Sequence, residues 1–158
     1  MLARIAAATE PNRQGYRRRE VIEGFGREGS LTPADLVALS VAKALERVTP
    51  AAVMVPTVSG ATARSVARFR LPVWIAGVSP HEETCRDLQF SYGVRSVLSG
   101  DHPEIWNDFA RKWIGDQGLE GELAILTEGP SVRNPEANHR MEIIELGLED
   151  RGRRESEE

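Results

Sequence analysis

The sequence has only one cysteine and no excess of positive charge. Cys85 has no second cysteine with which to form an intrachain disulfide, so a disulfide-stapled secreted domain is excluded and we expect a cytoplasmic protein. Lys and Arg total 20 against 24 Asp and Glu, which gives a net charge of -4. The molecule as a whole therefore offers no basic field for nucleic acid or an anionic membrane, and any anion site must be local.

Long hydrophobic runs are also missing. The apolar stretch 1–8 is interrupted by Arg4 and is followed by Glu10 and Pro11, so it is too short for a secretory or membrane-spanning segment. We interpret it as a short amphipathic helix. A chain of 158 residues with 41% hydrophobic residues is enough to build one compact core.

Several sequence motifs of cofactor and metal enzymes are absent. The sequence lacks GxxxxGK[ST], HExxH and paired CxxC motifs, which excludes a P-loop nucleoside triphosphatase and the common zinc motifs. His81 and Cys85 lie four residues apart on one predicted helix, but two ligands do not hold zinc. Residues 24–29 match the dinucleotide motif GxGxxG, but residues 30–33 separate these glycines from the start of the next predicted helix, which in that motif begins inside the glycine turn. Thr57 also stands where a dinucleotide site needs an acidic residue. We therefore interpret these glycines as linker and expect no metal or cofactor.

The alternation of helical and apolar segments predicts an α/β domain. Thr32 and Pro33 are typical of a helix start, and Val37, Val41, Leu45 and Val48 give that helix one apolar face. The further predicted helices are 61–69, a helix capped by Ser79 that runs from Pro80 to about Ser91, and 103–114, in which Ile105, Phe109 and Trp113 stack. The predicted strands are 51–56, 73–78, 94–98, 122–127 and 140–146.

This order predicts a three-layer αβα sandwich around a mostly parallel five-stranded sheet. No helix precedes the last strand, so we expect it to run antiparallel at a sheet edge. We expect three parts in the chain: an N-terminal helix and connector at 1–31, the α/β domain at 32–146, and a disordered charged tail at 147–158, which is almost without apolar residues.

The segment 57–64 (TVSGATAR) lies between a predicted buried strand and a predicted helix. Its three hydroxyl side chains and its glycine can surround an anion at the positive end of the helix, and Arg64 and Arg68 lie one helical turn apart, where they can add charge-assisted contacts. A plain helix cap by Ser59 or Thr62 explains the same residues equally well.

The order of several segments resembles the C-terminal α/β domain of pyruvate kinase. The resemblance begins with 57–70 (TVSGATARSVARFR) and 71–79 (LPVWIAGVS), and it covers roughly residues 32–146. The segments 81–94, 122–130 and 138–144 follow in the order that the family shows. Residues 1–10 (MLARIAAATE) are similar to the helix that ends the catalytic barrel of the family.

The resemblance implies a phosphate site and a second loop that closes over it. The loop similar to 57–62 binds the phosphate of an allosteric sugar phosphate in the family, and the loop similar to 128–139 closes over the ligand. The candidate effector-binding residues are Thr57, Ser59, Gly60, Ala61, Thr62, Arg64, Arg133 and His139. Val58 replaces a lysine that members responsive to fructose 1,6-bisphosphate can have, and 128–139 lacks tryptophan. These departures count against fructose 1,6-bisphosphate as the effector and leave a monophosphate sugar or a nucleotide open.

Three functions remain open. The first is a regulatory and subunit-contact domain of the pyruvate kinase type, either a fragment of the full enzyme or an independently encoded relative. We expect it to form a homodimer and to bind a phosphorylated effector. We expect no catalysis from it, because the resemblance places the catalytic residues in the family's barrel domain. The second is a small α/β enzyme acting on a phosphorylated substrate held by 57–62, with His139 as acid or base. We favour the plainer interpretation of His139 as a surface-loop residue, because nothing in the sequence identifies a partner for it. The third is an interaction scaffold whose loop binds no ligand.

Overall fold

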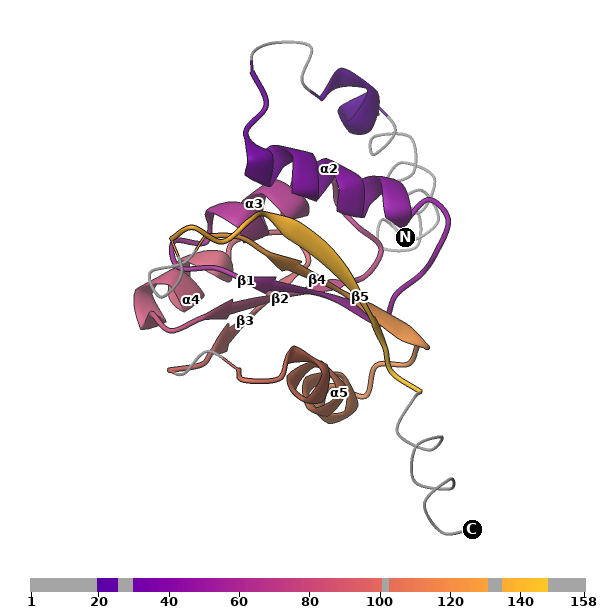
Figure 1. The fold of residues 1–158 in the computed structure, drawn as a ribbon, viewed down its shortest axis with the longest axis vertical. Helices are drawn as coiled ribbons and strands as arrows, with labels where there is room; N and C mark the ends of the chain where they lie inside the picture. The colour runs from indigo at the N-terminus through magenta and orange to yellow at the C-terminus, as the bar shows by residue number, and fades with distance from the viewer. Residues whose placement is uncertain (1–19, 26–29, 101–102, 131–134, 148–158) are drawn as a thin grey trace, which may run out of the picture.

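The structure, a computed structural model, describes residues 20–25, 30–100, 103–130 and 135–147. The predicted helix at 1–8, most of the predicted connector with the end of its glycine motif, and the predicted tail from 148 lie outside the described residues. The helices are α2 (Pro33–Ala44), α3 (Ala61–Ala67), α4 (Glu82–Leu88) and α5 (Trp106–Asp116). The strands are β1 (Ala52–Pro56), β2 (Trp74–Ser79), β3 (Val94–Leu98), β4 (Leu123–Glu128) and β5 (Arg140–Glu145) (Figure 1).

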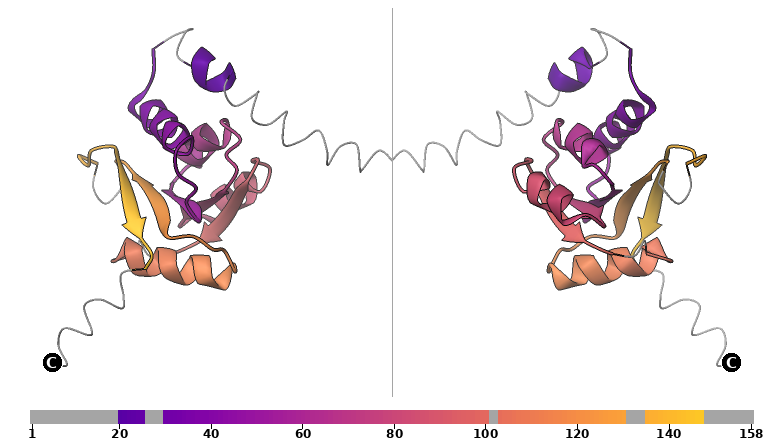
Figure 2. Two further views of the ribbon diagram at one scale, coloured as in Figure 1. Left: turned by 90° about the vertical axis from the view of Figure 1, so that its right-hand side faces the viewer. Right: turned by 90° about the vertical axis from the view of Figure 1, so that its left-hand side faces the viewer.

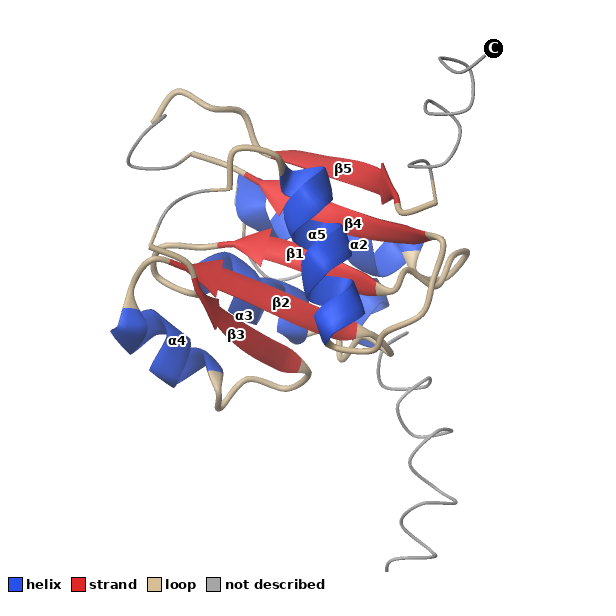
Figure 3. Ribbon diagram, turned by 90° about the horizontal axis from the view of Figure 1, so that it is seen from below, coloured by secondary structure: helices blue, strands red, loops and turns tan. Residues whose placement is uncertain are grey.

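In the described part of the chain these strands form one sheet with the order β3-β2-β1-β4-β5. The pairs β1–β2, β2–β3 and β1–β4 are parallel, and β4–β5 is antiparallel (Figure 3). This arrangement confirms the predicted mostly parallel sheet with an antiparallel strand at its edge. The strand order itself was not predicted.

Helices cover both faces of the sheet, so the layers are those of an αβα sandwich. The helices α2 and α3 lie on one face and α5 lies on the other (Figures 1 and 2). Leu88 of α4 belongs to the same core cluster as the buried residues of α2 and α3. In β1, Val53 and Val55 face this cluster, whereas Met54 faces the cluster under α5. The central strand is thus buried on both sides, as expected in a parallel sheet.

The start of α2 confirms the predicted cap. Thr32 is the N-cap, its Oγ1 accepts a hydrogen bond from the Asp35 amide at 3.2 Å, and Asp35 Oδ2 accepts one from the Thr32 amide at 3.2 Å. These contacts form a capping box, and the hydrogen bonds from Thr32 lower the pKa of Asp35. The predicted apolar face is only partly right: Val41 is buried beside Ala38 and Ala42, but Val48 lies past the helix and is 39% exposed.

Two details of the predicted helices are wrong. Ser79 does not cap α4: it is the last residue of β2, pairs with Leu98 of β3 and is fully buried, so the helix begins only after His81. Ile105 does not belong to the apolar face of α5: it precedes the helix and is 59% exposed. The buried residues of α5 are Trp106, Ala110, Trp113 and Ile114.

Part of the segment that we interpreted as a connector packs on the domain. Residues 20–24 are helical, and Ile22 is buried in the core cluster shared by α2, α3 and α4. The Phe25 and Phe69 ring centroids are 4.9 Å apart. Among the described residues, no helix is long and apolar enough to cross a membrane.

Two glycine-to-alanine substitutions should have opposite effects on stability. A Cβ at Gly77, in β2, would lie 2.9 Å from Leu88 Cδ1 and 3.3 Å from Val94 Cγ1, so Gly77→Ala should lower the free energy of unfolding by about 1 kcal/mol through overpacking. Gly115, in α5, has open space around it, so Gly115→Ala should raise that free energy by about 0.5 kcal/mol. Urea denaturation of both variants checks this, and a destabilising effect at Gly115 would contradict it.

Candidate functional site: a crevice between two parallel strands

The strand order creates a topological switch point between β1 and β4. From β1 the chain adds β2 and β3 on one side, and then returns to place β4 on the other side of β1. In open α/β sheets, ligands bind at the carboxyl ends of the strands where the order reverses. The loops that follow β1 and β4 meet this position, and they are the two loops that the sequence singled out.

The sheet itself opens at this position. The ladder between β1 and β2 continues to Pro56↔Val78, whereas the ladder between β1 and β4 ends at Met54↔Leu126. Both β1 and β4 continue for two residues beyond this last pair. Pro56 has no N–H group and cannot extend the ladder toward β4. The last two residues of each strand therefore lie beyond the β1–β4 ladder, and we call the position between these strand ends the crevice.

The loop after β1 is a tight turn closed by its own hydroxyl group. The Thr57 amide donates to the carbonyl of Val78 at 2.9 Å, and Thr57 Oγ1 accepts from the Gly60 amide at 2.9 Å. Gly60 has φ 78°, in the left-handed region. A Cβ at this position would lie 2.6 Å from Arg64 Nη1, the end of a flexible side chain that can move, so it is the left-handed backbone that requires glycine.

The amino terminus of α3 has no side-chain cap. Gly60 occupies the N-cap position, and neither Ser59 nor Thr62 makes a capping hydrogen bond. The plain helix cap that the sequence allowed for these two residues is therefore wrong. The first amides of a helix have no partner within the helix, so the amides from Ala61 onward are donors directed toward the loop.

Arg64 within α3 and Arg68 at its C-cap point to different places. Arg64 Nη2 donates to the carbonyl of Ser59 at 2.8 Å, so this guanidinium folds back over the turn. The Arg68 guanidinium instead lies 5.5 Å from the centroid of the Phe25 ring. The structure thus keeps Arg64 at the predicted site, but our prediction that Arg68 joins it is wrong, because the segment 20–25 provides an aromatic partner elsewhere.

A contact from α4 that the sequence did not predict holds the same loop. Thr84 Oγ1 donates to the carbonyl of Val58 at 2.7 Å, across 26 residues of sequence. Nothing in the local pattern of α4 distinguishes this threonine from an ordinary surface residue. The loop after β1 is therefore held by its own hydroxyl, by Arg64 and by α4.

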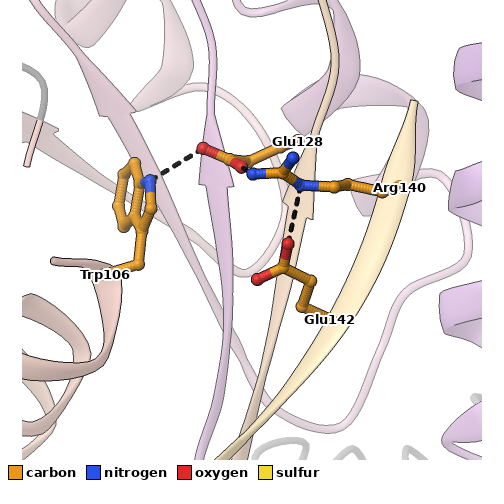
Figure 4. A network of polar contacts seen from close by, with 4 residues as sticks. All are labelled: Trp106, Glu128, Arg140 and Glu142. Atoms are coloured by element: carbon orange, nitrogen blue, oxygen red, sulfur yellow. Dashed lines mark hydrogen bonds and ion pairs between the residues drawn. The ribbon is translucent and has the colours of Figure 1, made fainter. Parts of the chain in front are cut away.

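The second loop is held at both of its ends. Glu128, the last residue of β4, lies opposite Arg140, the first of β5, and their side chains form an ion pair. Glu128 Oε1 also accepts from Trp106 Nε1 at 2.8 Å, and Arg140 Nε lies 2.6 Å from Glu142 Oε1 (Figure 4). The network joins β4, β5 and α5, and no local sequence pattern predicts it.

His139 lies against the start of this loop. A Cβ at Gly129 would lie 2.7 Å from His139 Nδ1, so the imidazole covers the face of this glycine. The His139 side chain is exposed, as are Ser59 and Ala61. Arg133, the remaining predicted ligand, lies outside the described residues. The structure thus places His139 on the loop after β4 and the group from Thr57 to Arg64 on the loop after β1.

Thr127 is a buried polar residue, and the sequence pattern predicts it only as part of a strand. Its side chain is 1% exposed, and Oγ1 has no hydrogen-bond partner in the described structure. Leaving a buried hydroxyl unsatisfied costs about 1–3 kcal/mol. Thr127 lies one residue beyond the last β1–β4 pair, so this cost is incurred at the crevice.

The chemistry of the described residues favours binding an anion. No three His, Cys, Asp or Glu side chains within the described ranges lie together as metal ligands. Burial raises the pKa of the Cys85 thiol, which opposes formation of a nucleophilic thiolate. The loop after β1 carries hydroxyl groups, the first amides of α3 and the Arg64 guanidinium, which are hydrogen-bond donors for an oxyanion.

The network at the second loop should contribute measurably to stability. Glu128→Leu removes the acceptor for Trp106 and the counter-charge of Arg140, so it should lower the free energy of unfolding by about 2 kcal/mol. Glu128→Gln keeps a carbonyl acceptor and should cost less than half as much. Urea denaturation followed by tryptophan fluorescence measures both. Equal losses in the two variants would show that the hydrogen bond to Trp106 contributes little.

Comparison with known proteins gives consistent results. The family model described as pyruvate kinase, alpha/beta domain, matches residues 35–144. The pyruvate kinase of Thermococcus litoralis is 36% identical over 155 residues, which cover 92% of this chain and 31% of that protein. The pyruvate kinase of Geobacillus stearothermophilus is 33% identical over 143 residues, covering 88% of this chain and 24% of that protein. The chain thus spans less than a third of the length of these relatives.

A solved structure shares the fold. The pyruvate kinase of Cryptosporidium parvum in complex with ADP superimposes with a TM-score of 0.73 at 18% sequence identity. The match covers 84% of this chain and 27% of that chain. At this identity the likeness supports the arrangement of helices and strands.

Proposed function

The chain belongs to the pyruvate kinase alpha/beta domain family, and from this premise we propose that it is a regulatory and subunit-contact domain that binds a phosphorylated effector and does not catalyse by itself. The observation that carries the proposal is the turn at Gly60. This glycine begins α3 without a side-chain cap, beside Thr57 and Ser59 at the switch point of the sheet. A phosphate group fits such a combination of amides and hydroxyls.

The charges at the crevice favour an effector with a single phosphate. Arg64 is the cation at the first loop, but it already donates to the Ser59 carbonyl. At the second loop, Arg140 is paired with the carboxylates of Glu128 and Glu142. A second phosphate would therefore meet a cation that is already neutralised. A sugar monophosphate or a nucleotide such as AMP is the effector class that we propose.

Subunit contact is proposed for the edge of the sheet formed by β5. This strand has a neighbour on one side only, and Ile143 on it is 63% exposed. Exposed edge strands are ready to pair with another chain, and a twofold axis lets the same edge serve in both subunits. We propose a homodimer, with phosphoryl transfer from phosphoenolpyruvate to ADP performed by the catalytic barrel with which the family associates this domain.

Effector binding should depend on the hydroxyl group of Ser59. Isothermal titration with glucose 6-phosphate, ribose 5-phosphate and AMP should detect binding of at least one of them to the wild-type chain. Ser59→Ala should weaken that binding about tenfold, because a hydrogen bond to a charged group is lost.

The matched control for this experiment is Ser91→Ala. Ser91 precedes β3 at the opposite end of the sheet, so its loss should leave the affinity unchanged. If none of the three phosphates binds the wild-type chain, the regulatory proposal fails and the interaction scaffold is favoured. Equal weakening by both variants would place the effect outside the loop.

Dimer formation should depend on the exposed apolar side chain of β5. Ile143→Arg should weaken self-association at least roughly tenfold, because apolar contact is lost and like charges meet at the twofold axis. Phe90→Arg is the control, since Phe90 is 93% exposed but precedes β3, at the other edge of the sheet. Sedimentation equilibrium measures both. A wild-type chain that stays monomeric at high concentration would contradict the proposal.

A further inference from the structure

Thr127 breaks the apolar pattern of β4 without an evident structural gain. The three residues before it, Ala124 to Leu126, are buried and apolar, and Thr127 is equally buried. Buried hydroxyl groups in native proteins nearly always have a hydrogen-bond partner. Thr127 Oγ1 has none among the described residues. Valine has the same shape and would fill this position without a polar atom, so packing alone does not account for the hydroxyl.

The alternation of side chains places this hydroxyl on the α3 side of the sheet. Ile125 faces the core cluster of α2, α3 and α4, and Leu126 faces the cluster under α5. Side chains two residues apart in a strand share a face, so Thr127 lies on the same side as Ile125. By the same alternation Val55 and Thr57 of the neighbouring strand and its loop share that side. The hydroxyl therefore points to the side on which α3 begins.

The hydroxyl also lies where the sheet is open. The β1–β4 ladder ends at Met54↔Leu126, one residue before Thr127. On its other side Thr127 is paired with Met141 of β5, so its backbone is held in the sheet while its side chain borders the crevice. Neighbouring strands are about 4.8 Å apart, which brings the end of β4 close to the loop that follows β1.

We propose that Thr127 is a ligand-binding residue of the crevice, and that its Oγ1 donates a hydrogen bond to a phosphoryl oxygen of the bound effector. The inference rests on the proposed function, and it adds a residue from β4 to the loop residues. A phosphoryl oxygen is a pure acceptor, which a hydroxyl can satisfy from an enclosed position. Because the side chain is shielded from bulk water, such a bond to a charged oxygen is strong.

An enclosed water molecule is the other source of an oxygen partner. A water would satisfy Oγ1 permanently and would stabilise the unliganded protein. A phosphoryl oxygen would satisfy it only in the complex. The two sources therefore differ in what the loss of the hydroxyl does to stability and to affinity.

The test uses Thr127→Val, which keeps the shape of the side chain, and Thr127→Ser, which keeps the hydroxyl. Titration calorimetry with ribose 5-phosphate and with inorganic phosphate measures affinity, and thermal unfolding without ligand measures stability. Thr127→Val should bind about tenfold more weakly than wild type and unfold at the same or a higher temperature. Thr127→Ser should bind within about threefold of wild type, since the donor is retained.

Each other outcome overturns the inference in a distinct way. If Thr127→Val binds as tightly as wild type, the hydroxyl does not contact the ligand. If Thr127→Val unfolds earlier while its affinity is unchanged, the partner is an enclosed water. If wild type binds neither phosphate, the inference falls. Titration with glucose 6-phosphate and AMP then decides separately whether the proposed function falls as well, and the first two outcomes leave the proposed function intact.

Discussion

The reversal of direction after β3 is the constraint on which the rest of the structure depends. Parallel strands are joined by right-handed crossovers, so a chain that adds strands in one direction places its helices on one face. The chain does this from β1 to β3, with α3 and α4 on the same side as α2. It then returns past β1 to form β4, and α5 consequently lies on the opposite face (Figure 3). The layered core and the crevice are two results of this one reversal.

The local chemistry of the crevice follows from how the strands end. Pro56 cannot donate to β4, so the sheet opens two residues early. The backbone after it must turn at once into α3, and it does so through the left-handed conformation of Gly60, which has no side chain to cap the helix. The contacts of Thr57, Arg64 and Thr84 hold the turn in place. A site held in this way is organised before a ligand arrives, which lowers the entropic cost of binding.

Sequence alone predicted the strands well because their signal is local. A short apolar run between turn residues identifies each buried strand, and the glycine with its hydroxyl neighbours identifies the first loop. The failures concern interactions between distant segments. The Arg68 guanidinium lies over the Phe25 ring rather than beside Arg64. The hydrogen bond from Thr84 to Val58 joins residues 26 positions apart, and the one from Trp106 to Glu128 joins residues 22 positions apart. The apolar face of α2 was predicted only in part, because two of its three buried residues are alanines, Ala38 and Ala42, which carry little periodic hydrophobic signal.

The small size of α3 decides what kind of recognition the crevice can provide. A helix of seven residues has a modest dipole, and the net charge of -4 opposes long-range attraction of an anion. The nearby guanidinium of Arg64 is shared with a backbone carbonyl. The phosphate binding that we propose therefore requires short hydrogen bonds rather than the field of the molecule. Hydrogen bonds depend on geometry, so such a site selects its ligand by shape more than by charge.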